Sequence, residues 1–289
     1  MFEKRTDLAL ERLEDLSGQP LPGVESRQWR QSPLSIHRIT VTDSRGEQAI
    51  GRPRGQYLTA QMEPEALSDS QWIFRSATVL AQLLRPMLPT KGTVLVAGLG
   101  NRALTPDALG PMTLEHLMVT RHLIEVMPGE FGHLRPVCAL AAGVLGSTGM
   151  ETAEILRGAA QRVEPSAIVA VDAMASRSLD RLCRTFQLSD TGIAPGSGAC
   201  NPRQELNART MGVPVIALGV PTVVEARTLA MELVPDGQLD EKSTPDAGML
   251  VSPKDIDLQV AKCAKVLGYA LNLALQGHMT AAEMEQYLC

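Results

Sequence analysis

Aromatic residues are scarce in this sequence: Phe, Trp and Tyr make up 3% of its 289 residues. Surfaces that bind nucleic acid by stacking on bases need such side chains. The chain also lacks a basic excess, because 27 Lys and Arg stand against 32 Asp and Glu for a formal net charge of −5. A protein that contacts phosphates is usually basic, so we expect no direct contact with nucleic acid.

Paired cysteines and long apolar runs are missing as well. The five cysteines show no C-x-x-C spacing, which excludes a thiolate zinc finger and suits a reducing compartment. No apolar run reaches the roughly 18 residues that span a bilayer. The charged first residues do not resemble the apolar stretch of a secretory signal. The sequence therefore predicts a cytoplasmic protein without membrane contact.

Strands and helices alternate along the last two thirds of the chain. Continuous apolar runs, typical of strands buried on both faces, occur at 93–97, 137–142, 167–171 and 214–220. Helical segments are expected between them at 111–126, 151–163 and 202–210. This alternation is typical of crossover units, so it predicts an α/β domain with a mostly parallel sheet and helices on both faces.

Further elements are expected at the two ends of the chain. Alternation at 34–42 and 56–61 predicts an N-terminal hairpin extension, and 182–188 predicts an antiparallel edge strand. A helix capped by Ser68 or Asp69 should run to about Leu88. A last helix, 253–276, should begin after Ser252 as N-cap and pack one apolar stripe on the sheet. The stripe consists of Ile256, Val260, Ala264, Leu267, Leu271 and Leu275.

Two aspartates follow apolar runs of the predicted sheet. Asp107 stands on a proline-bracketed turn after the run 93–97, and Asp172 comes directly after the run 167–171. The carboxyl ends of parallel strands meet at one edge, where such folds bind ligands. If the carboxyls face each other, repulsion raises one pKa, which leaves one acid and one base to activate a water and protonate a leaving amine. The alternative is that each aspartate only caps a helix.

The segment 190–201 is too rich in glycine to be a plain connection. Its backbone N–H groups could bind an oxyanion or the main chain of a substrate. A tight turn that needs positive φ is an equally open alternative. Cys200 has no histidine near it in sequence and is interpreted as a bystander. The candidate binding residues in this loop are Gly192, Gly196, Ser197 and Gly198.

Cofactor and metal sites receive little support from the sequence. The stretch Gly98-x-Gly100-x-x-Ala103 matches a dinucleotide fingerprint, but the prolines around it prevent the helix that the fingerprint requires. His122 and Glu125 are three residues apart and could share a metal ion, although a solvated helix face explains them better. We therefore expect no cofactor and no metal.

The motifs around these three loops resemble those of the germination proteases of spore-forming bacteria, a family of self-activating endopeptidases. The resemblance covers nearly the whole chain in one order, although the segment 225–250 is shorter than is usual in the family. The matching stretches are RTDLA at 5–9, GLGN at 98–101, TPDALGP at 105–111, TRHL at 120–123, GVLG at 143–146, GMET at 149–152, VDA at 171–173, SRS at 176–178, LSDTGI at 188–193, PGSG at 195–198, GVPVIA at 212–217, VPTVV at 220–224, VSPK at 251–254 and LNLAL at 271–275.

The resemblance carries expectations about fold and activity. It implies a three-layer α/β/α sandwich similar to that of hydrogenase maturation proteases, and a zymogen that assembles as a homotetramer. It implies an endopeptidase that degrades small acid-soluble spore proteins at germination, in the forespore or spore core. Asp107 and Asp172 correspond to the two aspartates regarded as catalytic. Because the histidine of the maturation proteases is absent from the expected loop, a metal-free aspartate mechanism is the interpretation.

The resemblance also implies self-processing near the N-terminus. The family cuts after an acidic residue that is followed by a bulky apolar residue and alanine, which predicts cleavage of the Asp7–Leu8 bond. Residues 1–7 would then be a pro-segment and 8–289 a single peptidase domain. Arg177 or the glycine-rich loop would bind the acidic side chain. Terminal residues are usually poorly ordered, which would allow this segment to extend into the crevice. The alternative is that Asp7 only caps a short helix through Leu16 and is not cut.

Two other functions stay open at this point. One is a metal-assisted peptidase that uses Asp107, Asp172 and either His122 or Glu125. The other is a protein that binds a peptide in the crevice without cutting it.

Overall fold

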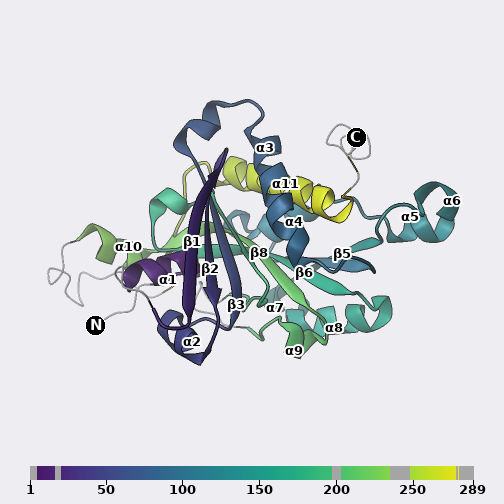
Figure 1. The fold of residues 1–289 in the computed structure, drawn as a ribbon, viewed down its shortest axis with the longest axis horizontal. Coiled ribbons are helices and arrows are strands. Elements are labelled where there is room, and N and C mark those ends of the chain that lie inside the picture. Colours follow the sequence, from purple (N-terminus) through teal and green to yellow (C-terminus); the bar gives the residue numbers. More distant parts are fainter. Residues whose placement is uncertain (1–4, 17–20, 197–202, 235–247, 278, 280–289) are drawn as a thin grey trace.

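Nine strands form one sheet in the part of the chain that the computed structural model describes, which is residues 5–16, 21–196, 203–234, 248–277 and 279 (Figure 1). Their order across the sheet is β1-β2-β3-β7-β8-β6-β4-β5, and β9 pairs with β8. The strands are β1 (Val24–Gln31), β2 (Leu34–Val41), β3 (Gly55–Met62), β4 (Val94–Leu99), β5 (Val137–Gly143), β6 (Ala167–Ser176), β7 (Thr185–Ser189), β8 (Val215–Glu225) and β9 (Leu250–Val251).

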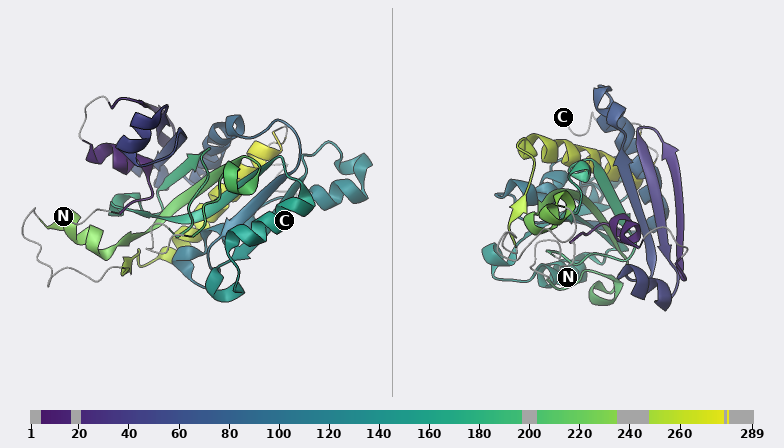
Figure 2. Two further views of the ribbon diagram at one scale, coloured as in Figure 1. Left: turned by 90° about the horizontal axis from the view of Figure 1, so that it is seen from below. Right: turned by 90° about the vertical axis from the view of Figure 1, so that its left-hand side faces the viewer.

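The helices lie on both sides of this sheet, which confirms the predicted α/β sandwich (Figures 1 and 2). The α-helices are α1 (Ala9–Asp15), α2 (Ser44–Ile50), α3 (Trp72–Leu84), α4 (Leu109–Leu114), α5 (Arg121–Val126), α6 (Pro128–Phe131), α7 (Leu145–Thr148), α8 (Thr152–Val163), α9 (Ala208–Met211), α10 (Ala226–Leu233) and α11 (Ile256–Leu275). Short 3-10 helices are η1 (Pro64–Ser68), η2 (Arg85–Met87), η3 (Thr105–Asp107) and η4 (Leu179–Arg181).

The sheet has a parallel and an antiparallel half. Strands β5, β4, β6 and β8 run parallel, as the apolar runs predicted. Strands β7, β3, β2 and β1 continue the same sheet in antiparallel pairs. The N-terminal strands therefore extend the central sheet, and the antiparallel pairs make it less uniformly parallel than the sequence suggested.

One face of the sheet, called here the α3/α11 face, carries the main apolar core. Val171, Phe186 and Leu188 point into it from β6 and β7 and are at most 1% exposed. Helices α3, α4 and α11 cover this face. Of the apolar stripe predicted for α11, every residue except the partly buried Ile256 is buried, which confirms that this helix packs on the sheet.

On the opposite face, called here the cleft face, the described helices cover the sheet at its two ends. Helices α8 and α9 pack over β4 and β6 in a small core that includes Leu95, Leu156 and Ile168. Helix α1 packs over β2 and β3 against Ile39 and Tyr57. Between these two cores the central strands β7, β8 and β6 border a cleft instead of a helix.

Several predicted boundaries differ in the structure. The strand expected at 182–188 is β7, which lies between β3 and β8 and is not at an edge. The helix expected at 111–126 is divided into α4 and α5, and only α9 occurs in the described part of 202–210. The first N-terminal strand, β1, was missed because its exposed polar residues hide the alternation.

Helix starts also differ from the sequence prediction. Helix α3 begins at Trp72, after η1, and not directly after Ser68 or Asp69. Helix α11 begins at Ile256 with Asp255 at its N-cap, so Ser252 lies outside the helix. Among the described residues, no helix combines the length and the hydropathy required to cross a membrane.

Candidate active site

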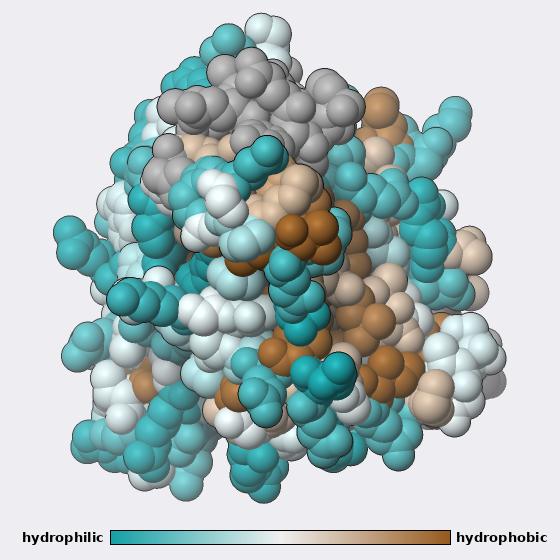
Figure 3. Space-filling view, turned by 90° about the vertical axis from the view of Figure 1, so that its right-hand side faces the viewer, coloured by the Kyte–Doolittle hydropathy of each residue, from teal (hydrophilic) through white to brown (hydrophobic). Residues whose placement is uncertain are grey.

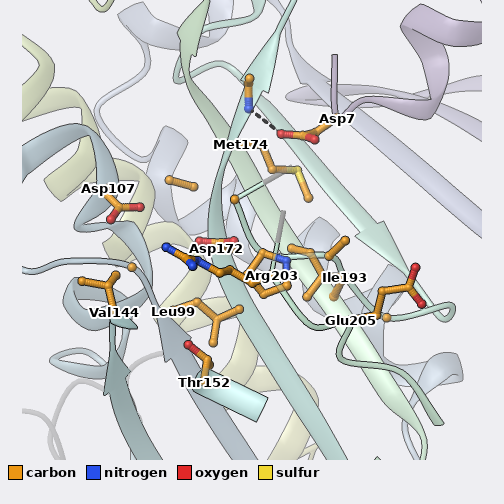
Figure 4. A pocket seen from close by; sticks show the side chains of 18 of the residues that line it. Asp7, Leu99, Asp107, Val144, Thr152, Asp172, Met174, Ile193, Arg203 and Glu205 are labelled. Carbon is orange, nitrogen blue, oxygen red and sulfur yellow. Dashed lines mark hydrogen bonds between the residues drawn. The ribbon is translucent and has the colours of Figure 1, made fainter. Parts of the chain in front are cut away.

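A cleft of about 590 Å³ opens on the cleft face of the sheet, over the carboxyl ends of β4 and β6. Asp107 and Asp172 both line it, as the position of each after an apolar run of the sheet predicted. Asp7, Gly192 and Gly196 also line it, so parts of the chain far apart in sequence meet here. Figure 4 shows the two aspartates approaching the cleft from separate segments.

The turn that carries Asp107 is held in place by two polar contacts. Asn101 follows β4, and its backbone N–H donates to Oδ2 of Asp107 over 2.8 Å. The hydroxyl of Thr222, on β8, donates to the carbonyl oxygen of Pro106 over 2.7 Å. Both contacts connect η3 to the sheet, so the carboxyl group of Asp107 has a fixed place at the edge of the cleft.

Glycine is required at position 100 for this arrangement. The φ angle of Gly100 is +98°, a conformation that residues with a side chain rarely adopt. A Cβ atom there would lie 2.1 Å from the backbone oxygen of Asp107. The close approach of the two loops therefore depends on the missing side chain.

Asp172 lies inside a strand and not just beyond its end. Strand β6 continues to Ser176, which places Asp172 in the middle of the sheet, where its side chain is 5% exposed. Burial raises the pKa of Asp172 well above its ordinary value, and the charges of Asp107 and Asp7 raise it further. The backbone N–H of Ala173 opposes this effect. Asp172 is therefore the better proton carrier of the pair.

Asp107 occupies a less extreme environment. Burial raises its pKa above the ordinary value, and the hydrogen bond from the N–H of Asn101 opposes this rise in part. Asp107 is half-buried, whereas Asp172 is almost fully enclosed. The pKa of Asp172 is thus raised further than that of Asp107, and such a difference is what an acid and base pair requires.

The N-terminal segment enters the cleft beside Asp172. The backbone N–H of Asp7 donates to the carbonyl oxygen of Ala175 over 2.9 Å, and the N–H of Ala175 donates to Oδ2 of Asp7 over 2.9 Å (Figure 4). Leu8 is fully buried. The N-cap of α1 is Leu8 without a side-chain hydrogen bond, so the expectation that Asp7 caps a helix is wrong. The expectation of a loosely held segment at Asp7 and Leu8 is also wrong.

The glycine-rich loop borders the cleft where the structure describes it. Gly192 and Gly196 have φ angles of +84° and +71°, which supports the interpretation of this loop as tight turns. A Cβ on Gly192 would lie 2.0 Å from the carbonyl oxygen of Leu206, since Ile193 and Leu206 pair in a β-bridge. Ser197, Gly198 and Cys200 lie outside the described residues.

Arg177 is placed away from the lining of the cleft. Its guanidinium forms ion pairs with Glu14, Asp15 and Glu232, so it holds α1 and α10 near the end of β6. The cations among the described lining residues are Arg52 and Arg203.

The histidine and glutamate considered for a metal site lie elsewhere. His122 and Glu125 are on α5 and do not line the cleft, and Glu125 forms an ion pair with Arg121. The structure therefore does not bring either residue to the two aspartates. No cluster of three or more His, Cys, Asp or Glu side chains suited to a metal ion occurs in the described ranges.

Sequence reasoning missed the polar side of β7. Gln187 and Ser189 line the cleft, while Phe186 and Leu188 between and beside them enter the main core. The alternation was visible in the sequence. The segment was interpreted as an antiparallel edge strand, but it lies between β3 and β8, where its polar side forms part of the floor of the cleft.

The chain is similar along almost its whole length to proteins named germination protease. The sequence model of the family described as germination protease matches residues 4–235. The germination protease of Clostridium tetani is 39% identical over 319 positions, which cover 98% of this chain and 99% of the relative. That of Caldanaerobacter subterraneus is 40% identical over 316 positions, 98% of each chain. That of Bacillus pumilus is 33% identical over 360 positions, 99% of this chain and 97% of the relative.

Proposed function

The chain belongs to the germination protease family and is therefore a peptidase, and we propose that it is an endopeptidase that uses Asp107 and Asp172 as its acid and base pair. The observation that carries this proposal is the pair itself: two aspartates from separate loops line one cleft, and the charge of Asp107 raises the pKa of the buried Asp172. Perturbed carboxyl pairs in a cleft are typical of catalytic sites.

The two carboxyls have complementary tasks in this proposal. Ionised Asp107 accepts a proton from a water, and the resulting hydroxide adds to the carbonyl carbon of the peptide bond. Protonated Asp172 donates its proton to the leaving nitrogen as the carbon–nitrogen bond breaks. The proton taken up by Asp107 then returns to Asp172, which restores the pair. The products are a carboxylic acid and an amine, and one water is consumed.

A cleavage assay with a peptide that contains Glu-Phe-Ala tests the proposal. We expect mass spectrometry to detect cut products with the wild-type protein and almost none with Asp107→Asn or Asp172→Asn. The substitution Asp180→Asn, at an exposed aspartate, is the control and should cleave normally. Binding of the intact peptide without products would contradict the proposal and indicate a peptide-binding protein.

The substrates proposed for the chain are small acid-soluble spore proteins, degraded in the spore at germination. The names of its relatives support a role in germination. The cleft is bordered by the cations Arg52 and Arg203, which suits a segment with an acidic residue before the cut. Incubation with purified spore proteins of this class should give fragments cut after acidic residues, and intact substrates would contradict this assignment.

Self-processing at the Asp7–Leu8 bond is a further part of the proposal. It is supported by the position of Asp7 in the cleft, close enough for its charge to raise the pKa of Asp172. The purified protein would be held at mildly acidic pH and its intact mass followed over hours. Loss of residues 1–7 from the wild type but not from Asp172→Asn is the expected result. An unchanged mass in both proteins would contradict it.

Assembly as a homotetramer is proposed from the family alone. The side of the molecule in Figure 3 is the one on which α5 and α6 project, and apolar side chains reach the surface there among polar ones. Val126 and Met127, at the end of α5, are 74% and 41% exposed. The mass of the purified protein in solution tests the assembly, and a monomeric mass would contradict it.

A further inference from the structure

The side-chain amide of Gln187 holds both backbone groups that flank Leu8. Its Nε2 donates to the carbonyl oxygen of Asp7 over 3.0 Å. Its Oε1 accepts from the backbone N–H of Ala9 over 2.8 Å. One side chain therefore binds the N-terminal segment as a neighbouring β-strand would, through a donor and an acceptor, and independently of the side chain at position 8.

Gln187 stands in one row with Asp172 across the sheet. Gly219 on β8 is the register partner of Gln187 on β7 and of Asp172 on β6. Register partners point to the same face, and neighbouring strands lie about 4.8 Å apart, so roughly 10 Å separate the two Cα atoms. Both side chains project from the cleft face, and the side chain of Met174 packs over Gly219 between them. Gln187 and Asp172 thus both lie on the floor of the cleft, on either side of Met174.

The acidic residue of the segment, Asp7, is bound by the backbone of β6. Ala175 lies three residues after Asp172 on β6, and its N–H binds the carboxylate of Asp7 while its carbonyl oxygen accepts from the N–H of Asp7. The acidic side chain of Asp7 is thus recognised by the backbone N–H of Ala175. The contacts of Ala175 and Gln187 together span the Asp7–Leu8 bond.

The side chain after that bond is enclosed. Leu8 is fully buried, and Gln187 itself is 4% exposed. The sequence Asp-Leu-Ala has an acidic residue, a bulky apolar residue and a small residue, in the order that the proposed cleavage requires. Asp7 lines the cleft, whereas Leu8 is the N-cap of α1 and Ala9 is the first residue of that helix. The segment therefore carries the residue types of a substrate at the point where the chain leaves the cleft.

We propose, on the basis of the function proposed above, that Gln187 is a substrate-binding residue. It hydrogen-bonds to the backbone of each substrate before and after the residue that follows the cut bond. Its Nε2 binds the carbonyl oxygen of the bond to be cut, and its Oε1 binds the N–H two residues further along. The N-terminal segment 7–9 displays this binding mode within the chain. The proposal assigns to Gln187 a role in binding peptides from other proteins, beyond anchoring the chain's own N-terminus.

A double-mutant cycle, in which both the protein and the peptide are varied, tests whether Gln187 binds the substrate backbone. Two peptides are compared, Glu-Phe-Ala in a longer sequence and the same peptide with lactic acid in place of the alanine, which replaces the N–H that Oε1 would accept with an ester oxygen. Binding is measured in the Asp107→Asn background, so that no cleavage interferes. Because the chain's own segment must be displaced by both peptides alike, its effect cancels in the ratio of the two affinities.

The expected result is a coupling between Gln187 and the substituted atom. With Gln187 present, the ester should bind about tenfold more weakly than the amide, in line with the loss of one hydrogen bond at a buried site. With Gln187→Ala the two peptides should bind within about twofold of each other. Gln187→Met, which keeps the size of the side chain, should behave in the same way if the alanine variant does not fold. Gln82→Ala, at an exposed position on α3, is the control and should retain the tenfold difference.

Two results would overturn the role of Gln187. One is an equal loss of affinity for the ester with and without the Gln187 side chain, which would limit Gln187 to holding the N-terminus. The other is no binding of either peptide. If the coupling is found but the wild-type protein with Asp107 cuts no peptide, Gln187 retains its role and the proposed peptidase reaction fails.

Discussion

The two faces of β6 and β7 are equally buried and chemically opposite. On the α3/α11 face, Val171, Phe186 and Leu188 are at most 1% exposed and lie among other apolar side chains. On the cleft face, Asp172 and Gln187 are 5% and 4% exposed. Gln187 hydrogen-bonds to backbone groups of the N-terminal segment, and the charges of Asp107 and Asp7 act on Asp172. Burial therefore does not distinguish the core of this protein from its candidate site.

The two faces differ in how burial of their side chains changes the free energy of folding. Burying a large apolar side chain contributes roughly 1.5–3 kcal/mol to stability. Burying a carboxyl group costs free energy, because the charged form loses its hydration. The α3/α11 face thus supplies the stability with which the cleft face holds Asp172 in a perturbed state. The two faces should respond to substitution in opposite ways.

Removal of either carboxyl should give the largest effect of all, and that effect is a loss of activity. Asp107→Asn and Asp172→Asn are each expected to lower the cleavage rate by about 10²–10⁴-fold, the range contributed by a general acid or base. The double variant should be little worse than either single one, because the two groups act as one unit. Steady-state rates on the Glu-Phe-Ala peptide check this. A single variant within about tenfold of the wild type would remove that residue from the mechanism.

A cavity on the α3/α11 face should give the reverse effect. Leu267→Ala on α11, where the leucine is 1% exposed, is expected to lower the free energy of unfolding by about 2–5 kcal/mol. Molecules that remain folded should cleave the peptide at the wild-type rate. Denaturant unfolding and the activity at low temperature measure the two quantities. Leu258→Ala on the same helix, with a leucine that is 52% exposed, is the control and should change stability by no more than about 0.5 kcal/mol.

A side chain at position 100 should displace the loop that carries Asp107. In Gly100→Ala the new Cβ meets the backbone oxygen of Asp107, so the carboxyl must move. We expect the cleavage rate of the folded protein to fall by about 10–100-fold, since small displacements of reacting groups are costly. Gly212→Ala is the control, because Gly212 also has positive φ but nothing lies within 4 Å of its Cβ position. Equal rates in the two variants would contradict the role assigned to Gly100.

The smallest expected effect is a gain in stability on the cleft face. The pKa of Asp172 is raised in the folded protein, so the folded state binds the proton more tightly than the unfolded state. Stability from this group is present below its unfolded pKa and is lost as pH rises toward the folded pKa. Asp172→Asn should therefore unfold about 2–4 °C above the wild type at pH 7, and the difference should vanish at about pH 3. A thermal shift series across pH measures it, and no gain at pH 7 would contradict the cost assigned to burial.

The parallel half of the fold could be predicted because its strands carry a simple signal. Continuous apolar runs marked β4, β5, β6 and β8, and the rule that parallel carboxyl ends share one edge brought Asp107 and Asp172 together. The exposed strand β1 has no such signal, since most of its side chains are polar and face solvent.

Contacts across long sequence distances could not be predicted. Asp7 binds Ala175 although 168 positions separate them, and no local pattern encodes that pairing. The polar side of β7 was visible as an alternation, but a strand pattern alone does not say whether the polar side meets solvent or a cleft. The position of β7 between two strands decides that, and it is a property of the whole sheet.

The central claim is that Asp172 holds a proton because it is buried and because the charge of Asp107 raises its pKa further. Carbon-13 NMR of labelled aspartate carboxyls, followed across pH in the wild type and in Asp107→Asn, measures this directly. Burial and the charge of Asp107 predict that Asp172 titrates well above the ordinary range near pH 3.9, and that the variant lowers its pKa. Titration of Asp172 near pH 3.9, or an unchanged pKa in Asp107→Asn, would contradict the account.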